Sequence, residues 1–156
     1  MNLDEQIQEL INDAPQDGTT PVLVEAIAPV LKQFASYLRH LQYYIVQSLN
    51  RSWVVNIISH PDQPEVERQV IYAFSSLKDV AGGPNSVKDP ELITLPVPVV
   101  HILFQMVAME GIDSIIFFEV PGNTLAGTEI RRADIQAMIQ AQLEQFRTPP
   151  IPPDIA

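Results

Sequence analysis

Three histidines, His40, His60 and His101, are the side chains best suited to bind a metal or move a proton near neutral pH. No two of them stand four residues apart, the spacing that places two imidazoles on one helix face, and zinc requires three or four converging ligands. The chain also contains no cysteine, which excludes disulfides, thiolate metal sites and cysteine nucleophiles. We therefore expect no metal site and no cofactor. We expect His40 in solvent, His60 in a turn and His101 hydrogen-bonded on an apolar helix.

A serine, a histidine and an aspartate lie close together in the chain, as Ser59, His60 and Asp62. Neighbours on a strand point to opposite faces, so Ser59 and His60 could share a proton only beyond the end of a strand. There is no G-x-S-x-G motif, and turn preferences predict that Pro61 and Asp62 form a hairpin turn instead. The glycine-rich residues 82–86 lack the Gly-Lys-Ser/Thr ending of a phosphate-binding loop, so we expect a plain loop there.

Glu119 follows an apolar run that is typical of a buried strand. A carboxyl group desolvated there would have a raised pKa and could act as a general acid. Arg131 or Arg132 lies across the expected hairpin, which favours a cross-strand ion pair with Glu119. The alternative is a small-molecule-binding domain or hydrolase whose pocket, between sheet and helix, contains Glu119, His101 and Arg131.

Aromatic side chains are candidates for an interface, because phenol and indole groups combine apolar area with a polar atom. The candidates are Tyr37, Tyr43, Tyr44 and Trp53. Tyr37 and Tyr44 are seven residues apart, so both should lie on one face of a helix. Packing of these rings against the sheet as part of the core is the other interpretation.

A proline-rich segment, residues 148–156, follows Arg147. A basic residue followed by spaced prolines can dock as a polyproline II helix in the aromatic groove of a partner. Such a segment can also pack on the apolar surface of its own domain. Both interpretations stay open at this point.

The charge balance is strongly acidic, with 9 Lys and Arg against 19 Asp and Glu and a net charge of −10. The cations are scattered, with only Arg131 and Arg132 adjacent, so we expect no nucleic acid partner and no attraction to an anionic bilayer. Residues 92–109 are mostly apolar, but prolines near their start leave too short a helix for a membrane span. The first residues lack the pattern of a secretory signal, and we expect a cytoplasmic protein.

Hydrophobic periodicity predicts an α+β domain over residues 1–147, followed by the extended tail 148–156. The expected order is α-α-β-β-α-β-β-α: an antiparallel sheet of two hairpins split by a buried helix, with helices at both ends. The expected helices cover 3–13, 21–49, 97–110 and 133–146, and the expected strands cover 53–58, 69–74, 114–120 and 127–131.

This pattern resembles the type III secretion chaperone-like fold over residues 21–146. The resemblance is carried by the strand pair at 53–58 and 70–74, the apolar helix at 97–110, the strand at 115–118 and the closing helix at 134–139. The additional N-terminal helix, the proline tail and the absence of a third strand before the central helix depart from that family. The resemblance implies a dimeric, non-enzymatic protein that binds an extended segment of another protein through apolar grooves. A chaperone-like or assembly-adaptor module, with another protein or a second copy as partner, is therefore the expected function.

Overall fold

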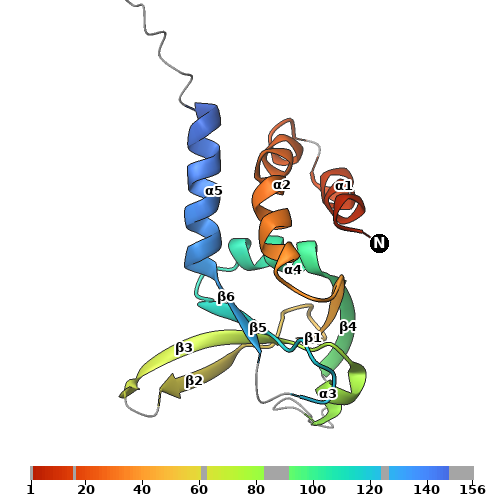
Figure 1. Cartoon of the computed structure of the whole chain (residues 1–156), viewed down its shortest axis with the longest axis vertical. Coiled ribbons are helices and arrows are strands. Elements are labelled where there is room, and N and C mark those ends of the chain that lie inside the picture. Colours follow the sequence, from red (N-terminus) through yellow and green to blue (C-terminus); the bar gives the residue numbers. More distant parts are fainter. Residues whose placement is uncertain (1, 16, 61–62, 83–91, 124–126, 148–156) are drawn as a thin grey trace, which may run out of the picture.

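The structure is a computed structural model that describes residues 2–15, 17–60, 63–82, 92–123 and 127–147. Helices occupy both ends of the described chain, and strands occupy most of its middle (Figure 1). The elements in chain order are α1 (Leu3–Asp13), α2 (Thr20–Ser36), β1 (Gln42–Ser48), β2 (Asn56–His60), β3 (Gln63–Ala73), α3 (Leu77–Gly82), β4 (Leu92–Pro98), α4 (Val99–Ala108), β5 (Ser114–Phe117), β6 (Thr128–Arg131) and α5 (Arg132–Arg147).

Two groups of strands form the sheet region. β2, β3, β5 and β6 form a four-stranded sheet in that order, and β1 pairs with β4. A backbone bridge joins the two groups, because Tyr44 N donates to Phe74 O at 2.7 Å and Phe74 N donates to Tyr44 O at 3.0 Å. β1 therefore extends the sheet beside the end of β3, on the same edge of β3 that β2 occupies further back.

The α+β class and both predicted hairpins are confirmed, since β2 pairs antiparallel with β3 and β5 pairs antiparallel with β6. The sheet is nevertheless mixed, because β3 and β5 pair in parallel. Parallel neighbours require a crossover of a dozen or more residues, and the chain from α3 through α4 supplies it. The expectation of an antiparallel sheet throughout was wrong at this central pair.

The long helix predicted over 21–49 was also wrong in its second half. α2 ends at Ser36, and β1 begins at Gln42. Aromatic and β-branched residues fill β1, and both of its faces are covered: Tyr43 and Ile45 enter one hydrophobic core, whereas Val46 enters another. Two-sided burial removes the usual polar alternation of a strand, so the apolar spacing of β1 also fits a helical period.

The central helix α4 is buried among other elements, as its apolar sequence predicts. Five of its side chains have almost no exposed surface: Val99, Val100, Ile102, Leu103 and Met106. They share one core with residues from α2 on one side and from β1, β3 and β5 on the other. Three other predicted features, the turn at Pro61 and Asp62, the loop after Gly82 and the tail 148–156, lie wholly or largely outside the described residues.

Candidate functional site

The predicted interface aromatics lie in three different environments. Tyr37 caps the C-terminus of α2 and is 66% exposed. Tyr44 is half-buried in β1 and packs against the core that contains Phe74. Trp53 is half-buried against the main core, and its backbone bridges that of Gln47. Because α2 ends before Tyr37, Tyr37 and Tyr44 do not share a helix face.

Two residues of the predicted pocket, His101 and Glu119, make hydrogen bonds to different partners. The Nε2 atom of His101 lies 3.2 Å from the backbone oxygen of Gln6, which confirms a hydrogen-bonded histidine on an apolar helix. The carboxylate of Glu119 accepts from the backbone N of Arg39 at 2.9 Å. Arg131 is exposed at the end of β6. Hydrogen bonding therefore does not bring Glu119, His101 and Arg131 together.

The expected ion pair between Glu119 and Arg131 or Arg132 is replaced by other contacts. Arg132 donates from Nε to Met106 O at 3.1 Å and from Nη2 to Val107 O at 2.9 Å. These carbonyls belong to the last turn of α4, where Met106 O also accepts from Met109 N at 3.1 Å. A guanidinium with several donors satisfies two such carbonyls at once, and Arg132 is thereby committed to the helix end.

Glu119 instead takes part in a part-buried contact with Tyr43, a residue of β1. The Tyr43 hydroxyl donates to a carboxylate oxygen of Glu119, and the Nε2 atom of His40 lies 2.6 Å from the Glu119 backbone oxygen. Burial raises the pKa of Tyr43 well above its ordinary value, and the Glu119 carboxylate adds to this shift by accepting the hydrogen bond and by charge repulsion. His40 is half-buried rather than in solvent. The phenol thus stays protonated as a donor and joins two segments of the chain.

A second buried polar contact holds the same stretch of chain from the side of α1. The side chain of Gln6, almost fully buried, donates from Nε2 to Leu41 O at 2.8 Å and accepts at Oε1 from Val100 N at 2.9 Å. Leu41 O also accepts from Val99 N. The N-cap residue of α4, Pro98, makes no side-chain cap. Gln6 therefore caps α4 from another helix, which local sequence around Gln6 does not indicate.

Residues 37–41, which we call the 37–41 connection, are thus held from three directions. Gln6 reaches them from α1, Val99 from the start of α4, and Glu119 from the chain after β5. The polar groups involved are paired with one another and with the backbone. This region has the hydrogen bonding of a structural junction.

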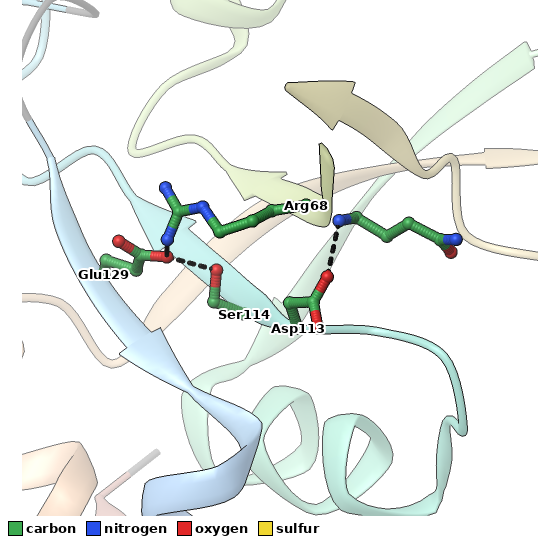
Figure 2. A network of polar contacts seen from close by, with 5 residues as sticks. Arg68, Asp113, Ser114 and Glu129 are labelled. Carbon is green, nitrogen blue, oxygen red and sulfur yellow. Dashed lines mark hydrogen bonds and ion pairs between the residues drawn. The ribbon is translucent and has the colours of Figure 1, made fainter. Parts of the chain in front are cut away.

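A third polar cluster lies at the base of the β2–β3 hairpin (Figure 2). Arg68 Nη1 and the Ser114 hydroxyl each lie 2.5 Å from Glu129 Oε2. Nearby, Asp113 Oδ2 accepts from Gln69 N at 2.8 Å. Figure 2 shows these side chains between β3, β5 and β6. The buried Ser114 hydroxyl donates to a carboxylate, so the cluster ties three strands together.

The turn after β5 is stabilised by a buried carboxylate from α3. Gly122 has φ +88° and Asn123 N donates to Val120 O at 3.0 Å, as in a type II turn with Pro121 and Gly122 at its centre. Both carboxylate oxygens of Asp79 accept from Gly122 N, at 3.0 and 3.1 Å. Asp79 is therefore committed to the turn.

The outer edge of β4 is poorly suited to pairing with an added strand. Tyr44 and Val46 of β1 make backbone bonds away from β4, to Phe74 and Val54. The residues opposite them in β4 consequently direct their backbone polar groups to the outer edge. Pro96 lies opposite Tyr44, and proline has no N–H to donate. This proline therefore disfavours pairing of β4 with an added strand, as edge-strand prolines do in other sheets.

An apolar hollow lies between the start of α2 and the last turns of α5. It has a volume of about 720 Å³. Glu25 supplies the charge among the residues that line it, which are Gly18, Thr19, Thr20, Val22, Leu23, Glu25, Ala26 and Leu143. Val22 is 63% exposed and Leu23 is 44% exposed. We call this hollow the α2–α5 groove.

The first turn of α2, which forms one wall of the groove, is capped by Asp17. One carboxylate oxygen of Asp17 accepts from Thr19 N at 2.9 Å and from Thr20 N at 2.7 Å, and the other accepts from the Thr20 hydroxyl at 2.8 Å. The backbone hydrogen bonds from Thr20 and then from Thr19 hold the pKa of Asp17 well below its usual range. An ionised cap thus fixes the start of the helix that carries Val22 and Leu23.

The other wall comes from α5, which rises from the sheet beside α2 (Figure 1). Ile135 and Ile139 of α5 are buried, whereas Leu143, one turn further, is half-buried. A second hollow of about 390 Å³, lined in part by Val107, Ile139 and Leu143, lies between α4 and α5. Leu143 therefore has open space on two sides.

Among the described residues, no group of three or more His, Asp or Glu side chains is arranged to hold a metal ion. Within the same residues, no helix has both the length and the apolar character needed to cross a membrane. No protein-family model matches the chain, and comparison with curated proteins gives no match. The α2–α5 groove combines the exposed apolar side chains of Val22 and Leu23 with a defined hollow.

Proposed function

We propose that this chain is a non-enzymatic protein-binding module, of the chaperone or assembly-adaptor kind, that binds an apolar segment of another protein in the α2–α5 groove. The observation that carries the proposal is the exposure of Val22 and Leu23 beside a hollow of about 720 Å³. Exposed apolar surface gathered at a concave site is typical of interaction sites. Fully burying a side chain such as Leu23 contributes about 1.5–3 kcal/mol.

The chemistry of the lining favours a protein segment over a small polar ligand. Small-molecule sites combine an apolar lining with several convergent polar groups that orient the ligand. Glu25, Thr19 and Thr20 supply the polar side chains here, and the two threonine hydroxyls already donate to Asp17. Specificity in such a groove comes from the shape of apolar side chains that enter it.

The polar side chains outside the groove that were candidates for catalysis have structural roles. The alternative of a small-molecule-binding domain or hydrolase depends on Glu119, His101 and Arg131. Glu119 is held by Tyr43 and Arg39, and the His101 ring bonds a backbone oxygen. These contacts give that alternative no support.

The resemblance to the type III secretion chaperone-like fold adds support for protein binding. The sequence pattern lacked a third strand before the central helix, and β1 supplies one ahead of β2 and β3. An extended segment would engage side-chain pockets in the groove rather than pair along the edge of β4, where Pro96 and Pro98 interrupt the donors. The mode we propose is therefore insertion of apolar side chains between α2 and α5.

The test is a selection of displayed random peptides on the full chain, followed by binding measurements with the selected peptides. We expect peptides rich in apolar residues, bound at least tenfold more weakly by a Leu23→Asp variant. Ile57→Asp is the matched control, because Ile57 is 62% exposed on β2, far along the chain from the groove. Equal binding to wild type and Leu23→Asp, or failure to select any peptide, would overturn the proposal.

A further inference from the structure

We infer that the segment bound in the α2–α5 groove carries a lysine or arginine beside its apolar side chains, and that this cation pairs with Glu25. The inference rests on the proposed function of the groove, because it names the kind of partner that the groove selects. Three features carry it: the unpaired carboxylate of Glu25, the charge of the surrounding surface and the position of Glu25 on α2.

The Glu25 carboxylate is exposed at the groove and makes no ion pair or hydrogen bond within the described part of the chain. The one cation of α2, Lys32, lies seven residues further along, about 10 Å along the helix axis. Lys32 already pairs with Asp4 at 2.5 Å. On α5, Arg132 donates to backbone oxygens of α4. Glu25 is therefore available to a cation from another molecule.

The surface around the groove is acidic. Glu25 lines the groove, and Glu144 lines the second hollow, which shares Leu143 with the groove. Among the lining residues that the structure describes, neither hollow contains a lysine or an arginine. The whole chain has a net charge of −10. A cationic segment is therefore attracted to this surface, whereas a second copy of the same acidic chain is repelled.

The position of Glu25 on α2 puts the cation at one margin of the apolar surface. Successive residues of an α-helix are turned by about 100°. Glu25 and Leu23 therefore lie about 160° apart around the helix, with Val22 and Ala26 between them. A segment whose apolar side chains contact Val22 and Leu23 consequently meets the carboxylate along one side only.

Lysine and arginine suit this margin, because their aliphatic stems pack on apolar surface while their charged ends stay in water. A stem that crosses Val22 brings its charged end to Glu25. An aspartate or glutamate in the same position would place two like charges together, which is unfavourable. Apolar contacts thus supply most of the affinity, and Glu25 selects among apolar segments by their charge.

The first experiment selects one library of displayed random peptides, in about 0.15 M salt, on the full chain and on its Glu25→Lys variant. We expect Lys and Arg beside the apolar residues of peptides selected on wild type, and Asp and Glu there on the variant. Glu67→Lys is the matched control, because Glu67 is exposed on β3 and the net charge changes equally. The control should select peptides like those of wild type. Peptides of the same charge from all three proteins would overturn the inference.

The second experiment exchanges the two charges. The affinities of one selected peptide, and of a version with its cation replaced by glutamate, are measured for wild type and for Glu25→Lys. Each single change should weaken binding about tenfold, and both together should restore it to within about threefold of the original. Single changes without effect, or a double change that weakens binding about a hundredfold, would contradict the pairing. Glu25→Gln, which removes the charge without reversing it, should weaken binding about threefold.

The two proposals fail in different ways. If Leu23→Asp weakens peptide binding and Glu25→Lys does not, the cation inference is wrong while the protein-binding proposal stands. If no peptide is selected on any of the proteins, the protein-binding proposal is wrong and the cation inference falls with it. Analytical ultracentrifugation tests the remaining occupant. Self-association of the chain that Leu23→Asp abolishes would assign the groove to a second copy and would contradict the inference.

Discussion

The two ends of α2 differ in how their chemical groups are satisfied. At the C-terminal end, the 37–41 connection is held by hydrogen bonds with Gln6, Val99 and Glu119. At the N-terminal end, Val22 and Leu23 lie largely in solvent beside the α2–α5 groove. The polar side chains Gln6 and Glu119 thus make structural hydrogen bonds at one end of α2. The apolar side chains Val22 and Leu23 are left exposed at the other end. The comparison supports our proposal that the apolar end is the binding site.

The largest expected effect is at the polar end, on replacing Gln6 by Leu. Gln6→Leu leaves the buried Val100 N–H without its acceptor and removes the cap of α4. A buried polar group without a partner costs about 1–3 kcal/mol, and with the lost cap we expect a loss of about 2–3 kcal/mol in the free energy of unfolding. Urea denaturation measures it. Gln8→Leu, on the exposed side of α1, is the control, and an equal loss in both variants would contradict the account.

A smaller effect, dependent on pH, is expected for Tyr43→Phe. The variant loses the hydrogen bond to Glu119, which contributes about 1–2 kcal/mol near neutral pH. Because the pKa of Tyr43 is raised in the folded state, its contribution is complete below the ordinary tyrosine pKa of about 10 and is lost as pH rises above that value.

The measurement for Tyr43 is denaturation near pH 7 and again near pH 11, a range that brackets the ordinary tyrosine pKa of about 10. The difference in stability between wild type and Tyr43→Phe should shrink at the higher pH. Tyr37→Phe is the control, since Tyr37 is exposed, and it should match wild type at both values. A constant difference for Tyr43→Phe would show that its phenol does not resist ionisation.

At the apolar end, Asp17→Ala should have a smaller and local effect. The pKa of Asp17 is lowered in the folded state, so its stabilisation is present above the ordinary aspartate pKa of about 3.9 and is lost as pH falls below it. Above that pH the variant should exchange the amide hydrogens of the first turn of α2 faster than wild type. Asp13→Ala, at the exposed end of α1, is the control. Unchanged exchange in Asp17→Ala would exclude its role as the cap of the groove wall.

The smallest effect on stability is expected for Leu23→Asp, the groove variant. Leu23 is partly exposed, and surface substitutions change stability by about 0.5 kcal/mol or less. Denaturation of Leu23→Asp should therefore resemble that of wild type while its peptide binding falls. A loss of several kcal/mol would instead make Leu23 a core residue and would weaken the contrast between the two ends of α2.

Much of the fold follows from local patterns in the sequence. The β2–β3 hairpin, the buried helix α4, the β5–β6 hairpin and α5 lie close to their predicted positions. β1 was not predicted as a strand, because a strand buried on both faces has no polar alternation. Residues 42–48 therefore continued the helical spacing of α2 by coincidence. The parallel pairing of β3 with β5 depends on the crossover between them, which no short pattern records.

The candidate site was harder to predict than the fold. Glu119 and His101 stood out by residue type. Their hydrogen-bond partners, however, lie more than 75 positions away in the sequence. The apolar spacing of α2 did not mark the groove, because Leu23 stands four residues before Ile27 and so continues the spacing through Ile27 and Leu31. The proximity of Val22 and Leu23 to Leu143 depends on tertiary packing and could not be read locally.

The most direct test maps a selected peptide onto the full chain by NMR titration, so that both ends of α2 are observed together. The account predicts shift changes that saturate with peptide at Val22, Leu23 and Ala26, with Leu41 and Tyr37 unchanged. Changes centred on Tyr37 and Leu41, with the groove residues silent, would contradict it and would place the binding surface at the opposite end of α2.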